Sequence, residues 1–223
     1  AVTVSASAAG VRLELHLPVN GKSGATGPAA GCSALTSDQV DTLNSVLSGM
    51  GLYGPSPGWA FLENVSSSTT KSTYCNAGAL IAPTFGGYTT IPSEIGYLHQ
   101  LEWIEIRDNQ ISSVPITIKH LDNLTTIYLA GNNISSIPSE IGQLDSLTNL
   151  ELSQNTGLGS LPPEIGDATS LSTLELDQTG LSAFPSGVLN LTNLTTLDIS
   201  VNSISTLPSG IDSLSNLSTL KLS

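Results

Sequence analysis

The sequence predicts an α/β solenoid of stacked units, each with one short strand, and all strands parallel in a single sheet. A leucine, once an alanine, recurs in successive units at steps of 23, 23, 24, 23 and 23 residues: Leu98, Leu121, Leu144, Ala168, Leu191 and Leu214. Each unit also carries an alternating apolar pair, such as Ile127 and Leu129, which is typical of a strand. A proline follows the second apolar cluster and favours an extended or short 3₁₀ segment there.

The remaining elements of a unit follow in a fixed order. An asparagine recurs where the chain should turn inward, and its side chain is expected to bond backbone groups: Asn109, Asn132, Asn155 and Asn202. In the fourth unit Gln178-Thr179-Gly180 falls at this place, so that turn is expected to be less well satisfied. The extra residue of the 24-residue step is expected around Thr156-Gly157. A single unit cannot bury its leucines, so neighbouring units must stabilise one another.

This pattern resembles the leucine-rich-repeat family, in its 23-residue class with an Ile/Leu-Pro step after the asparagine. The match covers residues 98–223, with five full units and part of a sixth. Subtracting 23 places a degenerate unit before them, at Ile81, Ile91, Pro92 and Ile95, so repeats are expected over 75–223. The resemblance implies a right-handed superhelix with its parallel sheet on the concave side, and a concave face that binds a protein or glycan.

Residues 32–74 resemble the small helical cap of plant-type extracellular members of that family. Thr36 and Gln39 form a capping box, and an apolar helical face follows at Val40, Leu43, Val46 and Leu47. Trp59 and Cys75 then occur in the family's order, although a second cysteine pair is missing. The two cysteines, Cys32 and Cys75, are expected to form a disulfide, and two unpaired buried thiols are the alternative.

Residues 1–31 predict a strand extension and a glycine-rich linker. The strand has apolar residues at every second position: Val11, Leu13, Leu15, Leu17 and Val19. It either packs on the chain's own cap or pairs with the sheet edge of another copy. The sequence ends at Ser223 directly after a predicted strand, which indicates a piece of a longer protein or an edge that another molecule covers. Head-to-tail assembly into a filament is therefore one hypothesis.

Composition excludes several function classes. Lys+Arg 6 against Asp+Glu 18 gives a net charge of -12, which argues against nucleic acid and anionic lipid as partners. No apolar run reaches the roughly 20 residues of a membrane span. The three histidines, His16, His99 and His120, have no metal-ligand spacing, and no phosphate loop or nucleophile elbow occurs. We therefore expect no catalysis, no metal and no cofactor.

Asn-X-Ser/Thr sequons predict N-glycosylation and hence a secreted protein. They lie at Asn64, Asn123, Asn133, Asn190, Asn193 and Asn216. The repeat consensus itself generates Leu-X-Asn-Leu-Thr, so some of these sequons are expected by chance.

The residue between the two apolar strand positions should point out of the concave face. This column and the tryptophan beside it are the predicted binding residues: Trp103, Glu105, Tyr128, Glu151, Glu175, Asp198 and Lys221. Glu151, Glu175 and Asp198 should lie on adjacent strands, either as solvated surface or as an acidic stripe for a basic partner or a cation. The sequence thus predicts an extracellular module that binds a protein or glycan, with the self-assembling filament as the alternative.

Overall fold

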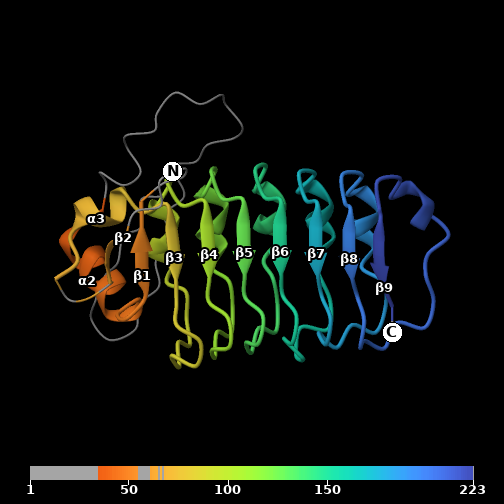
Figure 1. Cartoon of the computed structure of the whole chain (residues 1–223), viewed down its shortest axis with the longest axis horizontal. Helices are drawn as coiled ribbons and strands as arrows, with labels where there is room; N and C mark the ends of the chain where they lie inside the picture. The colour runs from red at the N-terminus through yellow and green to blue at the C-terminus, as the bar shows by residue number, and fades with distance from the viewer. Residues whose placement is uncertain (1–34, 55–60, 65, 67, 223) are drawn as a thin grey trace, which may run out of the picture.

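The computed structural model describes residues 35–54, 61–64, 66 and 68–222, and its strands form one sheet. Over these residues the sheet has nine strands in the order β2-β1-β3-β4-β5-β6-β7-β8-β9. Figure 1 shows them side by side in a row along the long axis of the molecule. The predicted α/β solenoid is confirmed.

The repeat strands are parallel, three residues long and in register. They are β3 (Ala79–Ile81), β4 (Trp103–Glu105), β5 (Thr126–Tyr128), β6 (Asn149–Glu151), β7 (Thr173–Glu175), β8 (Thr196–Asp198) and β9 (Thr219–Lys221). The middle residue of each strand from β3 to β8 is at most 2% exposed, whereas most flanking residues are partly exposed. The strands therefore bury one face and leave the other open, as strand alternation requires.

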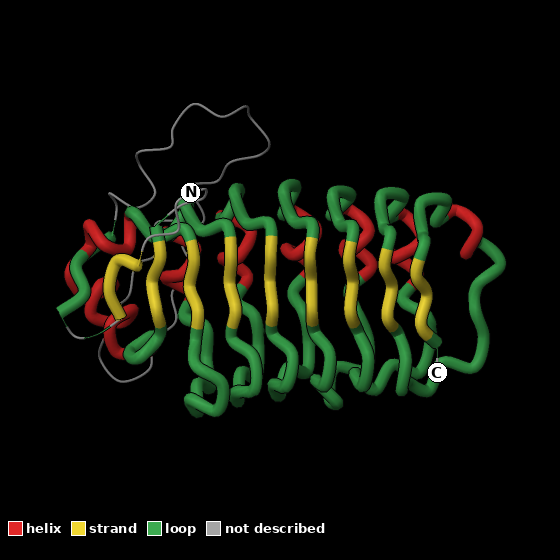
Figure 2. Tube along the Cα trace, viewed as in Figure 1, coloured by secondary structure: helices red, strands yellow, loops and turns green. Residues whose placement is uncertain are grey.

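Short 3₁₀ helices cover the buried face of the sheet. They are η1 (Ser93–Tyr97), η2 (Ile116–His120), η3 (Ser139–Gln143), η4 (Pro163–Asp167), η5 (Ser186–Asn190) and η6 (Ile211–Ser213), and Figure 2 shows most of them behind the strands, with η6 beside β9. A proline in extended conformation directly precedes each helix from η1 to η5, as the sequence predicts. These helices pack closely, because a Cβ added at Gly142 of η3 would lie 2.1 Å from the Glu164 carbonyl oxygen of η4.

The predicted asparagine column connects each turn to the adjacent units. Asn132 is 5% exposed, and its Nδ2 donates to the carbonyl oxygens of Ile106 and Leu129 at 2.6 and 3.0 Å. Its Oδ1 accepts from the Ile111 N–H at 2.9 Å. In the fourth unit the buried Thr179 hydroxyl donates to one carbonyl, that of Leu176, at 2.7 Å. That turn therefore has fewer side-chain bonds to the backbone, as predicted.

The residue before each of these positions has a positive φ. These left-handed residues are Asp108 (51°), Gly131 (66°), Gln154 (62°), Gln178 (55°) and Val201 (52°), and Phe85 (56°) of the first unit is left-handed as well. The left-handed region disfavours residues with a Cβ, and β-branched residues most of all. Val201 is therefore in a strained conformation, and Gly131 shows which residue the turn favours.

The predicted register of the degenerate first unit is wrong by one residue in its strand. Leu80, and not Ile81, pairs with Ile104 and is fully buried. Ile81 pairs with Glu105 and lies on the open face, because a shift of one residue reverses the direction of every side chain in a strand. Pro92 precedes η1 as predicted.

The cap contains more strand than the sequence indicates. Helix α2 (Ser37–Val46) begins with the predicted capping box and buries Leu43. Strand β1 (Gly51–Tyr53) then pairs antiparallel with both β3 and β2 (Phe61–Asn64), so the cap extends the repeat sheet. Helix α3 (Lys71–Cys75) follows.

Several predictions fall outside the described residues and stay predictions. They concern the strand extension of residues 1–31, with Val11, Leu13, Leu15, Leu17 and Val19, and also Trp59 and Cys32. The Cys32–Cys75 disulfide and the domain boundaries therefore remain untested.

Candidate functional site

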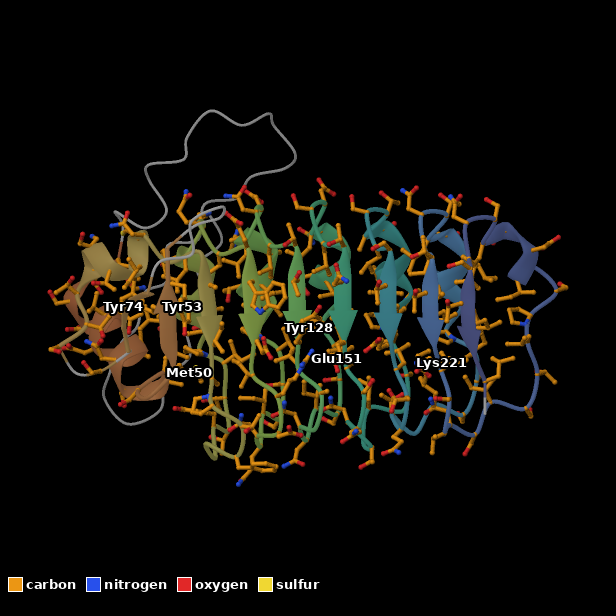
Figure 3. All side chains as sticks on the ribbon, viewed as in Figure 1. Met50, Tyr53, Tyr74, Tyr128, Glu151 and Lys221 are labelled. Atoms are coloured by element: carbon orange, nitrogen blue, oxygen red, sulfur yellow. The ribbon has the colours of Figure 1, made fainter. Side chains whose placement is uncertain are left out.

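The open face of the sheet is its side opposite the 3₁₀ helices, from β4 to β9. The predicted column Glu105, Tyr128, Glu151, Glu175, Asp198 and Lys221 runs across it in register. Figure 3 labels Tyr128, Glu151 and Lys221 on three of these strands. A second column, from Trp103 through Thr126 to Thr219, lies one position nearer the strand starts.

Two aromatic rings and an arginine stack on the β4–β5 part of this face. The Trp103 and Tyr128 ring centroids are 4.9 Å apart at 85°, an edge-to-face contact. The Arg107 Cζ lies 4.3 Å from the Tyr128 ring centroid, in cation–π geometry. The Trp103 Nε1–H donates to Glu105 Oε2 at 3.2 Å. We refer to Trp103, Glu105, Arg107, Tyr128 and Glu151 as the aromatic–arginine cluster.

Arg107 ties this cluster together from just beyond β4. Its Nη2 forms an ion pair with Glu151 at the end of β6, and its Nη1 lies 3.5 Å from Glu105 Oε1. Its Nε is buried and has no hydrogen-bond partner among the described residues. The sequence prediction omits Arg107, although its place two residues after Glu105 puts it on the same face by strand alternation.

Burial changes the acid–base properties of the cluster. It raises the pKa of Tyr128 above its ordinary value of 10.0. It also raises the pKa of Glu151 above 4.5, although the Arg107 charge acts in the opposite direction. The ring, cation–π and ion-pair contacts show that these side chains are already packed against one another in the protein alone.

A second ion pair lies at the far end of the column. The Lys221 Nζ is 2.9 Å from Asp198 Oδ2, and the Ser200 N–H and hydroxyl donate to Asp198 Oδ1 at 3.0 and 2.6 Å. Burial alone would raise the Asp198 pKa, but these hydrogen bonds outweigh it and hold the pKa below 3.8. The predicted like-charge neighbours Glu151, Glu175 and Asp198 do lie in register, yet the two outer carboxylates are ion-paired.

Two carboxylates between these ion pairs have no salt bridge of their own among the described residues. Glu175 of β7 and Asp177 just after it are partly exposed, and neither has a salt bridge within the part of the chain that the structure describes. Beside them, Ser153 is 4% exposed, and its buried Oγ has no hydrogen-bond partner among the described residues. The open face is therefore divided into an ion-paired aromatic part and an acidic part.

Family models match the repeats at two places. One, described as "Leucine rich repeat", covers residues 99–156, and a second of the same kind covers 193–214. The repeat region belongs to the leucine-rich-repeat family.

Solved leucine-rich-repeat structures resemble the chain over its repeats. A TDR receptor has a TM-score of 0.56 and 34% identity, with 62% of this chain and 25% of that chain covered. The PEPR1-AtPEP1 structure has a TM-score of 0.56 and 28% identity, with 60% of this chain and 19% of that chain covered. The leucine-rich repeat domain of the type III effector XCV3220 (XopL) has a TM-score of 0.59 and 26% identity, with 66% of this chain and 52% of that chain covered. The chain thus spans a quarter or less of the first two relatives, and no curated protein matches it.

The repeat geometry explains three of the six sequons. Asn123, Asn193 and Asn216 are exposed, and each donates through Nδ2 to a carbonyl of the preceding unit at 2.7–2.9 Å. The hydroxyl two residues after each asparagine also donates to a carbonyl of the preceding unit; these hydroxyls belong to Thr125, Thr195 and Ser218. The Asn-Leu-Thr/Ser pattern therefore has a structural reason that is independent of glycosylation.

Two of the other sequons lack this explanation. Asn133 and Asn190 are exposed, and neither side chain makes such a bond among the described residues. Asn64 ends β2, and its side chain lies outside the described part.

The described residues contain no metal-ligand cluster and no membrane-spanning helix. Across 35–54, 61–64, 66 and 68–222, no three or more His, Cys, Asp or Glu side chains gather as metal ligands would. In the same residues we find no helix with the length and apolar character that crossing a membrane requires.

Proposed function

We propose that the chain is a non-enzymatic protein-interaction module that binds a protein partner on the open face of its sheet. The aromatic–arginine cluster is the observation that carries this proposal. Trp, Tyr and Arg are the residue types most enriched among the energetically dominant residues of interfaces. Here all three are packed together on a face that the 3₁₀ helices leave uncovered.

Preorganisation supports the same assignment. The Trp103 ring is held by Tyr128 and Glu105, and the Arg107 side chain by Tyr128 and Glu151. A partner therefore meets side chains that have already lost much of their rotamer freedom, which reduces the entropy lost on binding. The strands beneath keep these groups at fixed spacing.

We further propose that the protein is extracellular and carries N-linked glycans. The similar structures include a receptor, and the exposed Asn133 and Asn190 offer sequons that the repeat hydrogen bonds do not occupy. A glycan ligand on the Trp103 ring is the finer alternative to a protein ligand.

A capture experiment with matched variants tests the interaction module. Wild type, Trp103→Ala/Tyr128→Ala and the control Glu164→Gln/Asp167→Asn on η4 would be immobilised and exposed to the same secreted protein mixture. We expect wild type and the control to retain the same proteins, and Trp103→Ala/Tyr128→Ala to lose them. Cooperative thermal unfolding of Trp103→Ala/Tyr128→Ala would show that this variant is still folded. Identical captured sets for all three would contradict the proposal.

The filament alternative depends on residues 1–20, which lie outside the described part. It has its own test, electron microscopy of the protein before and after deletion of these residues. Regular filaments that disappear on deletion would favour assembly as the main function. Isolated particles in both samples would exclude it.

A further inference from the structure

We propose that the partner presents an extended basic segment across β4 to β7, with a large apolar side chain on Trp103 and Tyr128 and a lysine or arginine over Glu175 and Asp177. This inference rests on the proposed function and adds the chemistry and orientation of the partner. It follows from three features of the open face: where charge is left unpaired, where a polar atom is left without a partner, and how far apart these places are.

The first feature is the distribution of charge. Arg107 already lies between Glu105 and Glu151, and Lys221 already pairs with Asp198. Glu175 ends β7 and Asp177 follows two residues later, and neither has a salt bridge among the described residues, although the more distant Lys221 charge acts on both. Placing a positive group between them relieves their mutual repulsion, so charge complementarity favours a basic occupant at β7.

The second feature is the Ser153 hydroxyl, which is independent of charge. Ser153 follows β6 on the open side, and the Gln154 N–H donates to the Asp177 carbonyl oxygen at 2.8 Å, so Ser153 borders the acidic pair. Its Oγ is buried without a hydrogen-bond partner among the described residues. Buried polar groups in folded proteins normally have a partner, and a donor or acceptor supplied by a bound segment satisfies this one.

The third feature is the distance between the two parts of the face. β4 and β7 are three strand steps apart, or about 14 Å at the usual spacing of about 4.8 Å. Four residues of extended peptide span about 13 Å. The apolar residue of the partner should therefore precede or follow its basic residue by four positions. The net charge of -12 also steers a basic segment toward the molecule at low salt.

Three pools of fluorescein-labelled 12-residue peptides test this inference by fluorescence anisotropy. The first pool fixes Phe and Arg four positions apart, the second fixes Phe and Glu four positions apart, and the third fixes Phe and Arg two positions apart. Each is titrated with wild type, with Glu175→Gln/Asp177→Asn and with the control Glu164→Gln/Asp167→Asn. Both double variants remove two negative charges, so they have the same net charge, and Glu164 and Asp167 are exposed on η4.

We expect the first pool to bind wild type most tightly, and its Kd to rise about tenfold in Glu175→Gln/Asp177→Asn, because two charge pairs of moderate strength are lost. The control should change Kd less than about twofold, since its charges lie on the opposite side of the sheet. Ser153→Ala should weaken the first pool by a smaller factor, about threefold, without altering the preference among pools.

The outcomes separate the inference from the proposed function. Equal weakening by both double variants would show non-specific attraction and overturn the inference. The inference would also be overturned if the second pool bound wild type and Trp103→Ala/Tyr128→Ala abolished that binding. The open face would then remain the binding site, as the proposed function requires. If no pool binds wild type, the inference is wrong, and the capture experiment alone decides the proposed function.

Discussion

Arg107 and Glu151 form an ion pair although 44 residues and one whole strand separate them. Arg107 follows β4 and Glu151 ends β6, so the guanidinium crosses the Tyr128 ring of β5 on its way. The side chains of three successive units are thus linked on the open face, in addition to the backbone hydrogen bonds beneath them. This link has consequences for stability that can be measured directly.

Removing Arg107 should destabilise the fold more than removing both partners. Arg107→Met leaves Glu151 partly buried without its cation, and we expect a loss of about 1–2 kcal/mol in unfolding free energy. Adding Glu151→Gln should recover more than half of it, because the uncompensated charge is gone. Urea unfolding of the two single variants and the double variant gives the coupling energy. Additive effects would show that the pair does not contribute to stability.

Glu151 and Asp198 should respond to acid in opposite directions. The folded pKa of Asp198 lies below 3.8, so Asp198 contributes stability above that pH and loses it as the pH falls through its folded pKa. The folded pKa of Glu151 lies above 4.5, so its ionised form is disfavoured by folding, and this penalty disappears as the pH falls through that pKa. Urea unfolding of Asp198→Asn and Glu151→Gln between pH 3 and 7 checks both signs. The deficit of Asp198→Asn should shrink below pH 3.8, and the benefit of Glu151→Gln should shrink toward pH 4.5.

Gly142 should tolerate no side chain. A Cβ at Gly142 would lie 2.1 Å from a backbone oxygen of η4, which has to move, whereas Gly157 has no atom within 4 Å. We expect Gly142→Ala to cost about 2–4 kcal/mol through strain between neighbouring units, and Gly157→Ala to stay within about 0.5 kcal/mol of wild type. Differential scanning calorimetry of the two variants provides the comparison. Similar melting temperatures would show that the 3₁₀ helices are less tightly packed than the structure indicates.

Val201→Gly should stabilise the protein despite deleting a side chain. Val201 is 59% exposed with a φ of 52°, so glycine relieves about 1 kcal/mol of left-handed strain and loses little burial. The control is Thr206→Gly, an exposed residue in the same unit without a positive φ, which should lose a few tenths of a kcal/mol. Thermal unfolding distinguishes the two directions. A lower melting temperature for Val201→Gly would show that the turn is unstrained.

The sequon asparagines should differ in their structural importance. Asn123→Ala removes a hydrogen bond to the His99 carbonyl oxygen and should cost about 0.5–1.5 kcal/mol in protein without glycans. Asn133→Ala should be neutral, since Asn133 is exposed and makes no such bond among the described residues. Unfolding of bacterially produced variants measures this, and peptide mapping of protein from a secretory host shows separately which of the two carries sugar.

The repeat period predicts the strand columns from β4 to β9 correctly because strand alternation and apolar spacing are local properties of the chain. The same arithmetic fails in the first unit, where the step between strands is 24 residues and Leu80 takes the buried place. It also misses β1, a three-residue strand whose pairing with β3 depends on tertiary contact and not on its own pattern.

The binding face is predictable only in part. Strand register fixes where Glu175 and Asp198 lie, but not which carboxylates acquire a cation. Arg107 reaches two strands away, and a sequence pattern does not give the direction of a long flexible side chain. Likewise, Ser153 is indistinguishable in sequence from any other serine of the repeats, and its unpaired hydroxyl emerges from the surrounding packing.

The 24-residue unit shows that an inserted residue leaves the sheet register intact, since Glu151 still pairs with Glu175 and the extra residue falls between Asn155 and Pro162, outside the strands. Adding or removing a repeat therefore changes the length of the sheet by one whole strand spacing. Duplicating the unit at 121–143 would place Glu175 and Asp177 one strand spacing, about 4.8 Å, farther from Trp103. A partner that fits this longer sheet would need its apolar and basic residues one or two positions farther apart. Distance along the open face is thus a heritable quantity that repeat duplication alters in discrete increments.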